Sequence, residues 1–245
     1  MKASPERPEP DSPIPGIRRN VFILGITSFL TDLSSEIIYP LVPLFLTSVL
    51  GAPLAVVGLI EGIAESTAST LKVFSGWISD RMHRRRPLTI IGYSVSAVAK
   101  PLLAVATVWP VVLLLRFGDR VGKGIRSAPR DALIADSSDP ESRGRAFGFH
   151  RAADTAGAAL GALVALAALG LIGERYRTIF LIAAVPAALG VLSIFFVRER
   201  VHPHPHAERP HLSLKQFDRK FKLFLLASAI FALGNSSDVF LILRA

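Results

Sequence analysis

Residues 111–136 read VVLLLRFGDRVGKGIRSAPRDALIAD. The stretch is long enough to cross a bilayer as one helix, yet it carries the charged residues Arg116, Asp119, Arg120, Lys123, Arg126, Arg130 and Asp131. At about 100° per residue these side chains fall within an arc of roughly 140°, and apolar side chains take the opposite side. A single charge at the centre of a membrane helix costs on the order of 3 kcal/mol. We therefore expect the ionic face to look onto water or counter-charges inside a helix bundle.

The composition indicates a membrane protein. Hydrophobic residues make up 51% of the chain and charged residues 19%, and the mean hydropathy is +0.45. Long apolar runs recur at short intervals, which is not typical of a soluble chain of 245 residues. Cysteine is absent, so neither disulfides nor thiolate metal sites are expected. The net charge of +9 lies mainly in the connections between apolar runs, and nucleic acid is therefore not an expected partner.

The order of polar and apolar stretches predicts the domain organisation. Residues 1–20 are rich in proline and charge, which predicts a disordered cytosolic tail rather than a cleavable signal peptide. The apolar stretches that follow are each near the ~20 residues that a bilayer requires. They are residues 21–46, 54–79, 88–108, 111–136, 146–172, 178–197 and 223–245. We expect a six-helix transmembrane bundle over 21–197, a basic cytosolic linker over 198–222 and the start of a seventh span over 223–245.

Lysine and arginine outside the predicted spans set the orientation. They gather in the tail, in the connections after the second and fourth spans, and in the linker, which all lie on one side of the membrane. The connections on the other side carry only Arg175 and Arg177. This asymmetry predicts a multi-pass protein of the cell membrane with a cytoplasmic N-terminus.

Polar residues inside the spans are paired at helical spacing. The pairs are Asp32 with Glu36 in the first span, Glu61 with Glu65 in the second, and Arg151 with Asp154 in the fifth. We therefore expect the first, second, fourth and fifth helices to line a polar space, while the uncharged sixth packs outside or faces lipid. The third span is mostly apolar, and this pattern assigns no place to its Lys100. Gly157 and Gly161 in the fifth span predict close approach to another helix.

The connection between the second and third spans resembles a signature loop of the major facilitator superfamily. The residues that match this loop are Gly76, Asp80, Arg81, Arg84 and Arg85. On the fourth span, Arg120, Lys123 and Gly124 are similar to a second pattern of the family. On the fifth, Gly157 and Gly161 match part of the family's antiporter pattern, and Ala162 replaces its proline.

The resemblance covers the whole chain and implies the first six-helix half of such a transporter, its linker and the beginning of its second half. We therefore expect the sequence to be a fragment of a longer protein. Asn235 and Asp238 would then be cavity residues of the second half.

The function that the resemblance implies is secondary active transport of a small solute across the inner membrane by alternating access. The string GDRVGKG at 118–124 is not a nucleotide cradle, because it lacks the Ser or Thr that follows Lys in a P-loop. We expect coupling to protons, because a buried carboxylate that is exposed alternately to the two sides can load and release a proton. The candidate solute and proton pathway comprises Asp32, Glu36, Glu61, Glu65, Arg116, Asp119, Arg120, Lys123, Arg126, Arg151 and Asp154. The candidate cytosolic gate comprises Gly76, Asp80, Arg81, Arg84 and Arg85.

Several alternatives stay open at this point. Each buried carboxylate could instead be a permanent salt-bridge partner of a basic residue on the fourth or fifth span. A metal-ion or siderophore exporter of the same fold, or a non-transporting membrane sensor, would also fit the pattern. An enzyme is not expected, because the spans contain neither a Ser/His/Asp arrangement nor HExxH. We expect no cofactor, no bound metal and no obligate protein partner. The expected partners are the solute, protons and the lipid bilayer.

Overall fold

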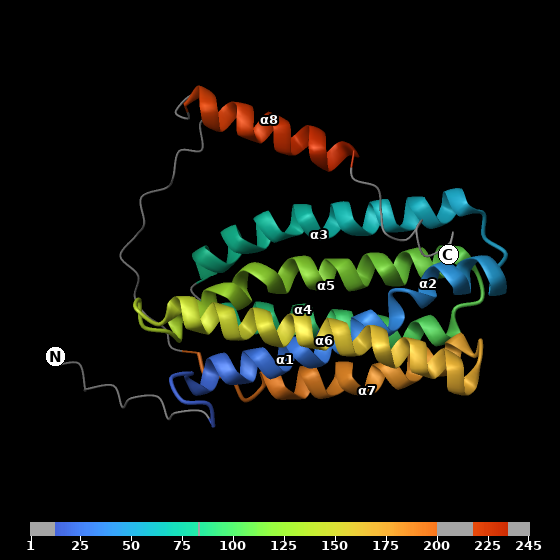
Figure 1. The fold of residues 1–245 in the computed structure, drawn as a ribbon, viewed down its shortest axis with the longest axis horizontal. Coiled ribbons are helices and arrows are strands. Elements are labelled where there is room, and N and C mark those ends of the chain that lie inside the picture. Colours follow the sequence, from blue (N-terminus) through green and yellow to red (C-terminus); the bar gives the residue numbers. More distant parts are fainter. Residues whose placement is uncertain (1–12, 83, 200–217, 235–245) are drawn as a thin grey trace. The chain divides into compact units, whose positions relative to one another are not determined.

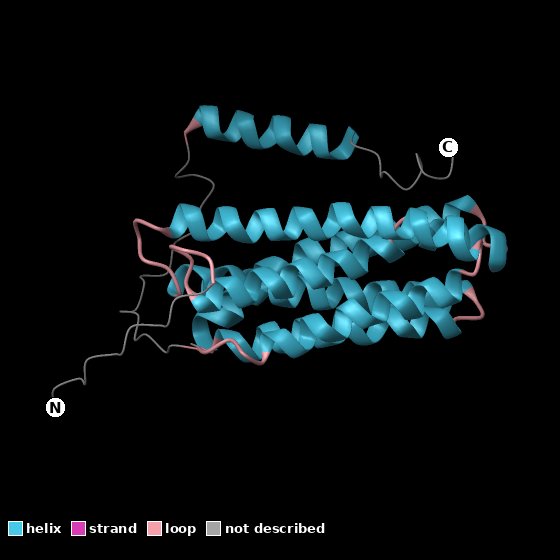
Figure 2. Cartoon of the chain, turned by 60° about the horizontal axis from the view of Figure 1, so that its bottom comes forward, coloured by secondary structure: helices cyan, strands magenta, loops and turns pink. Residues whose placement is uncertain are grey.

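The computed structural model describes residues 13–82, 84–199 and 218–234. The chain divides into two compact parts, residues 1–200 and residues 201–245. The described ranges contain helices and no strand (Figure 2). Within the first part, long helices run side by side as a bundle (Figure 1). The all-α fold class expected from the sequence is confirmed.

The first predicted span is a helix with a break. α1 (Arg19–Ile38) is helical because backbone groups at membrane depth must find their hydrogen-bond partners within the segment. The helix is interrupted at Tyr39 and Pro40, since proline offers no N–H to continue the ladder. The chain then continues as α2 (Leu41–Leu44) and a π-helix, η1 (Phe45–Val49).

The other helices of the bundle follow the predicted spans, with ends that shift by a few residues. α3 (Leu54–Met82) is followed by α4 (Arg85–Leu102), which tightens into a 3-10 turn, η2 (Leu103–Val105). α5 (Trp109–Asp136) has Pro110 in its first turn, where a missing N–H costs no helical hydrogen bond. α6 (Arg143–Ile172) ends at Gly173, whose φ of 66° favours glycine. The last helix of the bundle is α7 (Tyr176–Ile194).

The bundle is held by two groups of contacts between helices. α1 packs against α6 and α7, while α5 packs against α3 and α4, and α4 also contacts α7. The contact between α1 and α6 is close enough to require glycine. A Cβ on Gly157 would overlap the carbonyl oxygen of Phe29, and one on Gly161 would lie 2.6 Å from that of Leu33. The close approach predicted from these two glycines is confirmed.

Buried apolar side chains pack together at two levels along the direction of α1. Near the start of α1, Val21 and Leu24 pack in one cluster with Tyr93 and Ile134. Beyond the end of α1, the ring of Phe45 contacts Phe180 and Tyr176, with centroids 5.3 and 6.3 Å apart. Asp32, Ser35 and Glu36 of α1 lie between these two apolar levels.

Five helical segments in the described ranges are long and apolar enough to cross a membrane. They are Arg19–Val49, Leu54–Arg81, Arg85–Val105, Arg143–Ile172 and Tyr176–Ile194. α5 has a similar length, 28 residues, but its ionic face excludes it from this set. α5 is therefore the helix whose presence in a membrane depends on its neighbours.

The second part of the chain contains one described helix, α8 (Arg219–Gly234). It begins before residue 223, where the seventh span was predicted to start. The tail residues 1–12, most of the predicted linker, and both Asn235 and Asp238 lie outside the described residues.

Candidate functional site

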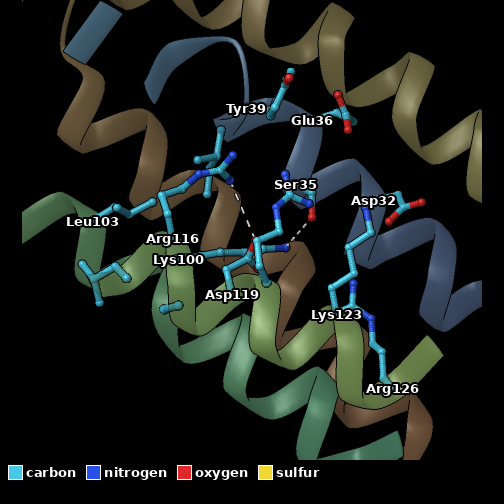
Figure 3. Close-up of a pocket in the computed structure, with 14 residues that line it drawn as sticks. Asp32, Ser35, Glu36, Tyr39, Lys100, Leu103, Arg116, Asp119, Lys123 and Arg126 are labelled. Carbon is cyan, nitrogen blue, oxygen red and sulfur yellow. Dashed lines mark hydrogen bonds and ion pairs between the residues drawn. The ribbon is translucent and has the colours of Figure 1, made fainter. Parts of the chain in front are cut away.

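A cavity of about 70 Å³ lies between α1, α4 and α5 (Figure 3). Its lining consists of Asp32, Ser35, Glu36, Ile38, Tyr39, Ala99, Lys100, Leu103, Leu115, Arg116, Asp119, Arg120, Lys123 and Arg126. Five of these side chains are cationic and three are carboxylates, so the lining has an excess of positive charge. α5 supplies five of these eight charges, because its ionic residues recur every three or four positions and share one face.

Arg116 of α5 and Glu61 of α3 form a buried bidentate salt bridge. The Nη2 atom of Arg116 lies 2.8 and 2.9 Å from the two carboxylate oxygens of Glu61, and its Nε donates to one of them at 3.2 Å. Both side chains are only 5% exposed. Asp119, one turn further along α5, lies 3.8 Å from Nη1 of the same guanidinium. Glu61 thus forms the kind of salt bridge that the sequence had left open for each carboxylate.

Arg120 makes the equivalent contact one turn further along both helices, but with an exposed partner. Its Nη2 lies 3.1 Å from Oε1 of Glu65, whose side chain is 59% exposed. The Nε of Arg120 is buried and has no acceptor among the described residues. One hydrogen-bond donor of this cavity-lining guanidinium is therefore unsatisfied.

Lys100 of α4 is the cavity residue to which the sequence pattern assigned no place. It is 3% exposed, and its ammonium donates to the carbonyl oxygen of Thr31 at 3.1 Å and to the hydroxyl of Ser35 at 3.0 Å. Figure 3 shows this contact from α4 to α1. The signal available in the sequence was a lone lysine inside an apolar span, which is costly unless the side chain reaches a polar space.

Arg126 is also buried against neutral partners. Its Nη1 donates to the hydroxyl of Ser96 at 2.6 Å, and its guanidinium lies 4.6 Å from the centre of the Tyr93 ring. The neighbouring backbones are in contact, since a Cβ on Gly92 would lie 2.7 Å from the carbonyl oxygen of Gly122. This close crossing of α4 and α5 brings the side chains of both helices to the same cavity.

Lys123 is the most exposed of the cavity cations, and Figure 3 shows it extending from α5 toward Asp32 of α1. Within the described ranges, no carboxylate lies within 4 Å of its ammonium. Glu36, one turn along α1 from Asp32, lines the same cavity and is partly exposed.

Asp32 also joins the cavity to a second polar cluster between α1 and α6. Its carboxyl group lies beside the carboxyl group of Asp154, close enough for the two to interact. Asp154 accepts a hydrogen bond from Ser28 at 2.8 Å and pairs at 3.1 Å with Arg151, whose side chain is 80% exposed. Two carboxyl groups can share a hydrogen bond only when one of them is protonated.

The structure brings most of the predicted pathway residues to one place, with two differences. Four of the predicted residues do not line the cavity. Glu61 and Glu65 pair with the lining residues Arg116 and Arg120. Asp154 pairs with Arg151 and lies beside Asp32. Of the four helices expected to line the polar space, α1 and α5 line this cavity, whereas α3 and α6, the second and fifth spans, do not. α4, the third span, lines it through Lys100, because its close crossing with α5 places it there.

The predicted gate residues lie around one end of the bundle. Arg85 bonds through its guanidinium to the carboxylate of Asp136 and, at 3.1 Å, to the carbonyl oxygen of Ala132. Asp80 is 3.9 Å from the same guanidinium. We call Asp80, Arg85, Arg86, Asp136 and Glu199 the Arg85 network.

This network connects four helices. The backbone N–H groups of Arg85 and Arg86 both donate to Glu199, which follows α7, and Arg86 donates to the carbonyl oxygen of Phe195 at 2.8 Å. The ends of α3, α5 and α7 are thereby tied to the start of α4.

The contacts described for the other three predicted gate residues lie outside this network. Arg81 stacks on the ring of Trp77, with its guanidinium 3.8 Å from the ring centre. Arg84 is exposed just before α4, and Gly76 packs against Ala128 of α5. The described residues contain no group of three or more His, Cys, Asp or Glu side chains placed to hold a metal ion.

The chain matches the family model of the Major Facilitator Superfamily over residues 24–244. It is 40% identical over 229 residues to an uncharacterized MFS-type transporter of Methanocaldococcus jannaschii, a match that covers 94% of this chain and 57% of that protein. It is 29% identical over 143 residues to a multidrug resistance protein of Photorhabdus laumondii, covering 58% of this chain and 35% of that one. The chain thus spans about half the length of the curated relatives it matches.

Solved structures show the same fold. A POT family transporter in complex with a thioalcohol-conjugated peptide superposes with a TM-score of 0.66 and 18% identity, over 88% of this chain and 45% of that one. A bacterial homologue of the human lysosomal transporter Spinster, in an inward-facing occupied conformation, superposes with a TM-score of 0.64 over 74% of this chain and 44% of its own. Together with the family match over nearly the whole sequence, these likenesses show that the chain belongs to the major facilitator superfamily.

Proposed function

We propose that this protein is a secondary active transporter that moves a small solute by alternating access, and that the cavity between α1, α4 and α5 is part of its solute path. The observation that carries the proposal is a cluster of eight charged side chains enclosed by membrane-length helices. Such residues are costly at membrane depth and are typical of substrate and ion pathways. The proposal concerns the whole protein that the gene encodes.

We place the N-terminus and the Arg85 network on the cytoplasmic side of the cell membrane. The excess of lysine and arginine in the connections at this end supports the orientation. In addition to the Arg85 network, Arg18 pairs with Asp139 here at 2.5 Å. Because the Arg85 network joins the ends of α3, α5 and α7 to the start of α4, we assign it the role of a cytosolic gate. The gate closes when these ends are held together.

Proton coupling is the second part of the proposal, and Asp32 with Asp154 is its site. The closeness of the two carboxyl groups supports this assignment, because such a pair can share one proton. Loss of that proton would leave two carboxylates facing each other between α1 and α6, where their repulsion favours separation of the two helices. A proton gradient could in this way bias the conformational equilibrium.

The test is solute uptake into proteoliposomes with and without an imposed pH gradient, while internal pH is recorded. We expect the wild-type protein to move protons together with solute. Asp32→Asn removes the titratable group but keeps a hydrogen-bonding side chain, so solute exchange should persist while its response to the gradient is lost. Glu141→Gln, on an exposed connection outside the cavity, is the matched control and should behave as wild type.

Two results would contradict this assignment. Solute transport that never changes internal pH would exclude proton coupling. A gradient response that survives in both Asp32→Asn and Asp154→Asn would place the proton site elsewhere.

The alternative of a metal-ion exporter has less support from this cavity. The three carboxylates of the lining lie among cationic side chains, which disfavour a metal cation beside them. The relatives named multidrug resistance proteins are consistent with transport of organic solutes.

A further inference from the structure

We propose that the cavity binds its solute through an oxyanion group, a carboxylate or a phosphate, held by Lys100, Lys123 and Arg126. This inference rests on the proposed transport function and adds the chemical class of the solute. It follows from the hydrogen-bond donors of the cavity and from the way its charges are already paired.

Two of the five cavity cations have a carboxylate partner outside the lining. Arg116 is bound by Glu61 in a buried bidentate pair, and Arg120 is bound by Glu65. Asp119 is enclosed by the positive charges around it and lies 3.8 Å from Arg116. With these two arginines paired, the three remaining cations share the lining with the carboxylates of Asp32, Glu36 and Asp119. The case for an anion therefore rests on hydrogen-bond donors that have no acceptor, not on an excess of positive charge.

The other three cations have only neutral hydrogen-bond partners in the described part of the chain. Lys100 donates to a carbonyl and a hydroxyl, and Arg126 donates to a hydroxyl and stacks on a ring. Lys123 has no salt bridge to a described carboxylate, and Asp32, which it approaches, also lies beside Asp154. Figure 3 shows these cations around one space, contributed by α4 and α5.

The cationic side chains of the cavity also carry more hydrogen-bond donors than the described hydrogen bonds use. An ammonium carries three donors and a guanidinium five, and neither can accept a hydrogen bond. The single described hydrogen bond of the Arg126 side chain and the unsatisfied Nε of Arg120 leave several donors for a ligand. An oxyanion is the complementary group, because it accepts only and its hydrogen bonds to charged donors are strong. The volume of about 70 Å³ has room for a few water molecules or for such a group.

The absence of cysteine from this sequence allows a binding test that does not depend on transport. Leu115→Cys introduces a thiol into the cavity lining without changing its charge. We would measure its labelling rate with a neutral maleimide in the purified protein. The probes are sodium phosphate, sulfate, acetate and succinate, with sodium chloride at equal ionic strength as the reference and tetramethylammonium chloride as the cationic control.

At least one oxyanion is expected to slow labelling, and tetramethylammonium is not. A phosphate or sulfate effect without a carboxylate effect would identify the phosphate class, and the reverse would identify the carboxylate class. In Lys123→Gln the protecting anion should bind about 10-fold or more weakly, whereas Lys123→Arg should keep most of the protection. Lys72→Gln removes an exposed lysine of α3 outside the cavity and should leave protection unchanged.

A second measurement does not require a charge variant to fold. The labelling rate by an anionic methanethiosulfonate, divided by that of a cationic one, should be higher at Leu115→Cys than at Thr107→Cys on the exposed turn before α5. An equal or lower ratio would overturn the proposal, as would protection by none of the oxyanions or equal protection in Lys123→Gln. Oxyanion protection without solute transport would instead reject the transport function and leave the anion site standing.

Discussion

Glu61 and Glu65 are one turn apart on α3, and each pairs with an arginine of α5, but their surroundings differ. The side chain of Glu61 is 5% exposed and that of Glu65 is 59% exposed. A buried charge that loses its partner keeps its full desolvation cost, whereas an exposed one is solvated by water. The two residues therefore form a natural matched pair.

We predict that Glu61→Gln destabilises the protein by about 3–5 kcal/mol, because buried Arg116 loses its bidentate partner and keeps only the more distant Asp119 as a counter-charge. Glu65→Gln should cost about 0–1 kcal/mol, as expected for an exposed pair. Reversible unfolding in mixed micelles, followed by far-ultraviolet circular dichroism, measures both. Equal losses for the two variants would show that burial does not determine the strength of these pairs.

The sequence predicted the ionic face of α5 well but not its partners. Periodicity placed Arg116, Arg120, Lys123 and Arg126 on one face, and the structure turns that face to the cavity. Periodicity carries no information about which helix lies opposite, so the pairing of Arg116 with Glu61 was open. For the same reason Lys100 was missed, because its role depends on how closely α4 crosses α5.

At the scale of elements, the contact between α1 and α6 depends on two glycines. Gly157 and Gly161 have no room for a Cβ against the α1 backbone, whereas Gly148, on the same helix, has open space around its Cα. Residues that are small at such contacts allow two membrane helices to approach closely.

We predict that Gly157→Ala destabilises the protein by about 1–3 kcal/mol, because the helices must move apart. Gly148→Ala should be neutral or stabilising by about 0.5–1 kcal/mol, since alanine is the better helix former. Thermal unfolding of the detergent-solubilised protein compares the two variants. A Gly157→Ala protein as stable as Gly148→Ala would show that the contact is looser than it is in the structure.

The helices themselves could be predicted because a bilayer restricts which backbone structures can cross it. Apolar length fixed each span to within a few residues, since only a helix satisfies its own backbone at that depth. The break in the first span after α1 was less visible. Pro40 and Pro43 lie there, but whether proline bends a helix or ends it depends on the hydrogen-bond partners that neighbouring groups offer to the freed backbone carbonyls.

At the scale of the whole molecule, the cavity combines side chains that are far apart in sequence. Ser35 accepts a hydrogen bond from Lys100, and Arg116 binds Glu61, across sequence separations of 65 and 55 residues. Local patterns could show that each helix has a polar face but not how the faces meet. The prediction of how the helices are arranged came from the resemblance to the superfamily. The family match over residues 24–244 confirms that resemblance.

The central claim is that this cavity opens alternately to the two sides of the membrane, with the Arg85 network closing the cytosolic side. The most direct test is labelling of Leu115→Cys by a membrane-impermeant maleimide, applied separately to the two faces of sealed vesicles of known orientation. Thr107→Cys, on the turn before α5, checks that orientation because it should react from one face only.

We predict that Leu115→Cys reacts from both faces. Arg85→Gln should raise its labelling rate from the cytosolic face and lower it from the other, because the ends of α3, α5 and α7 are no longer tied to α4. Reaction from one face only, with rates that Arg85→Gln leaves unchanged, would contradict alternating access through this cavity.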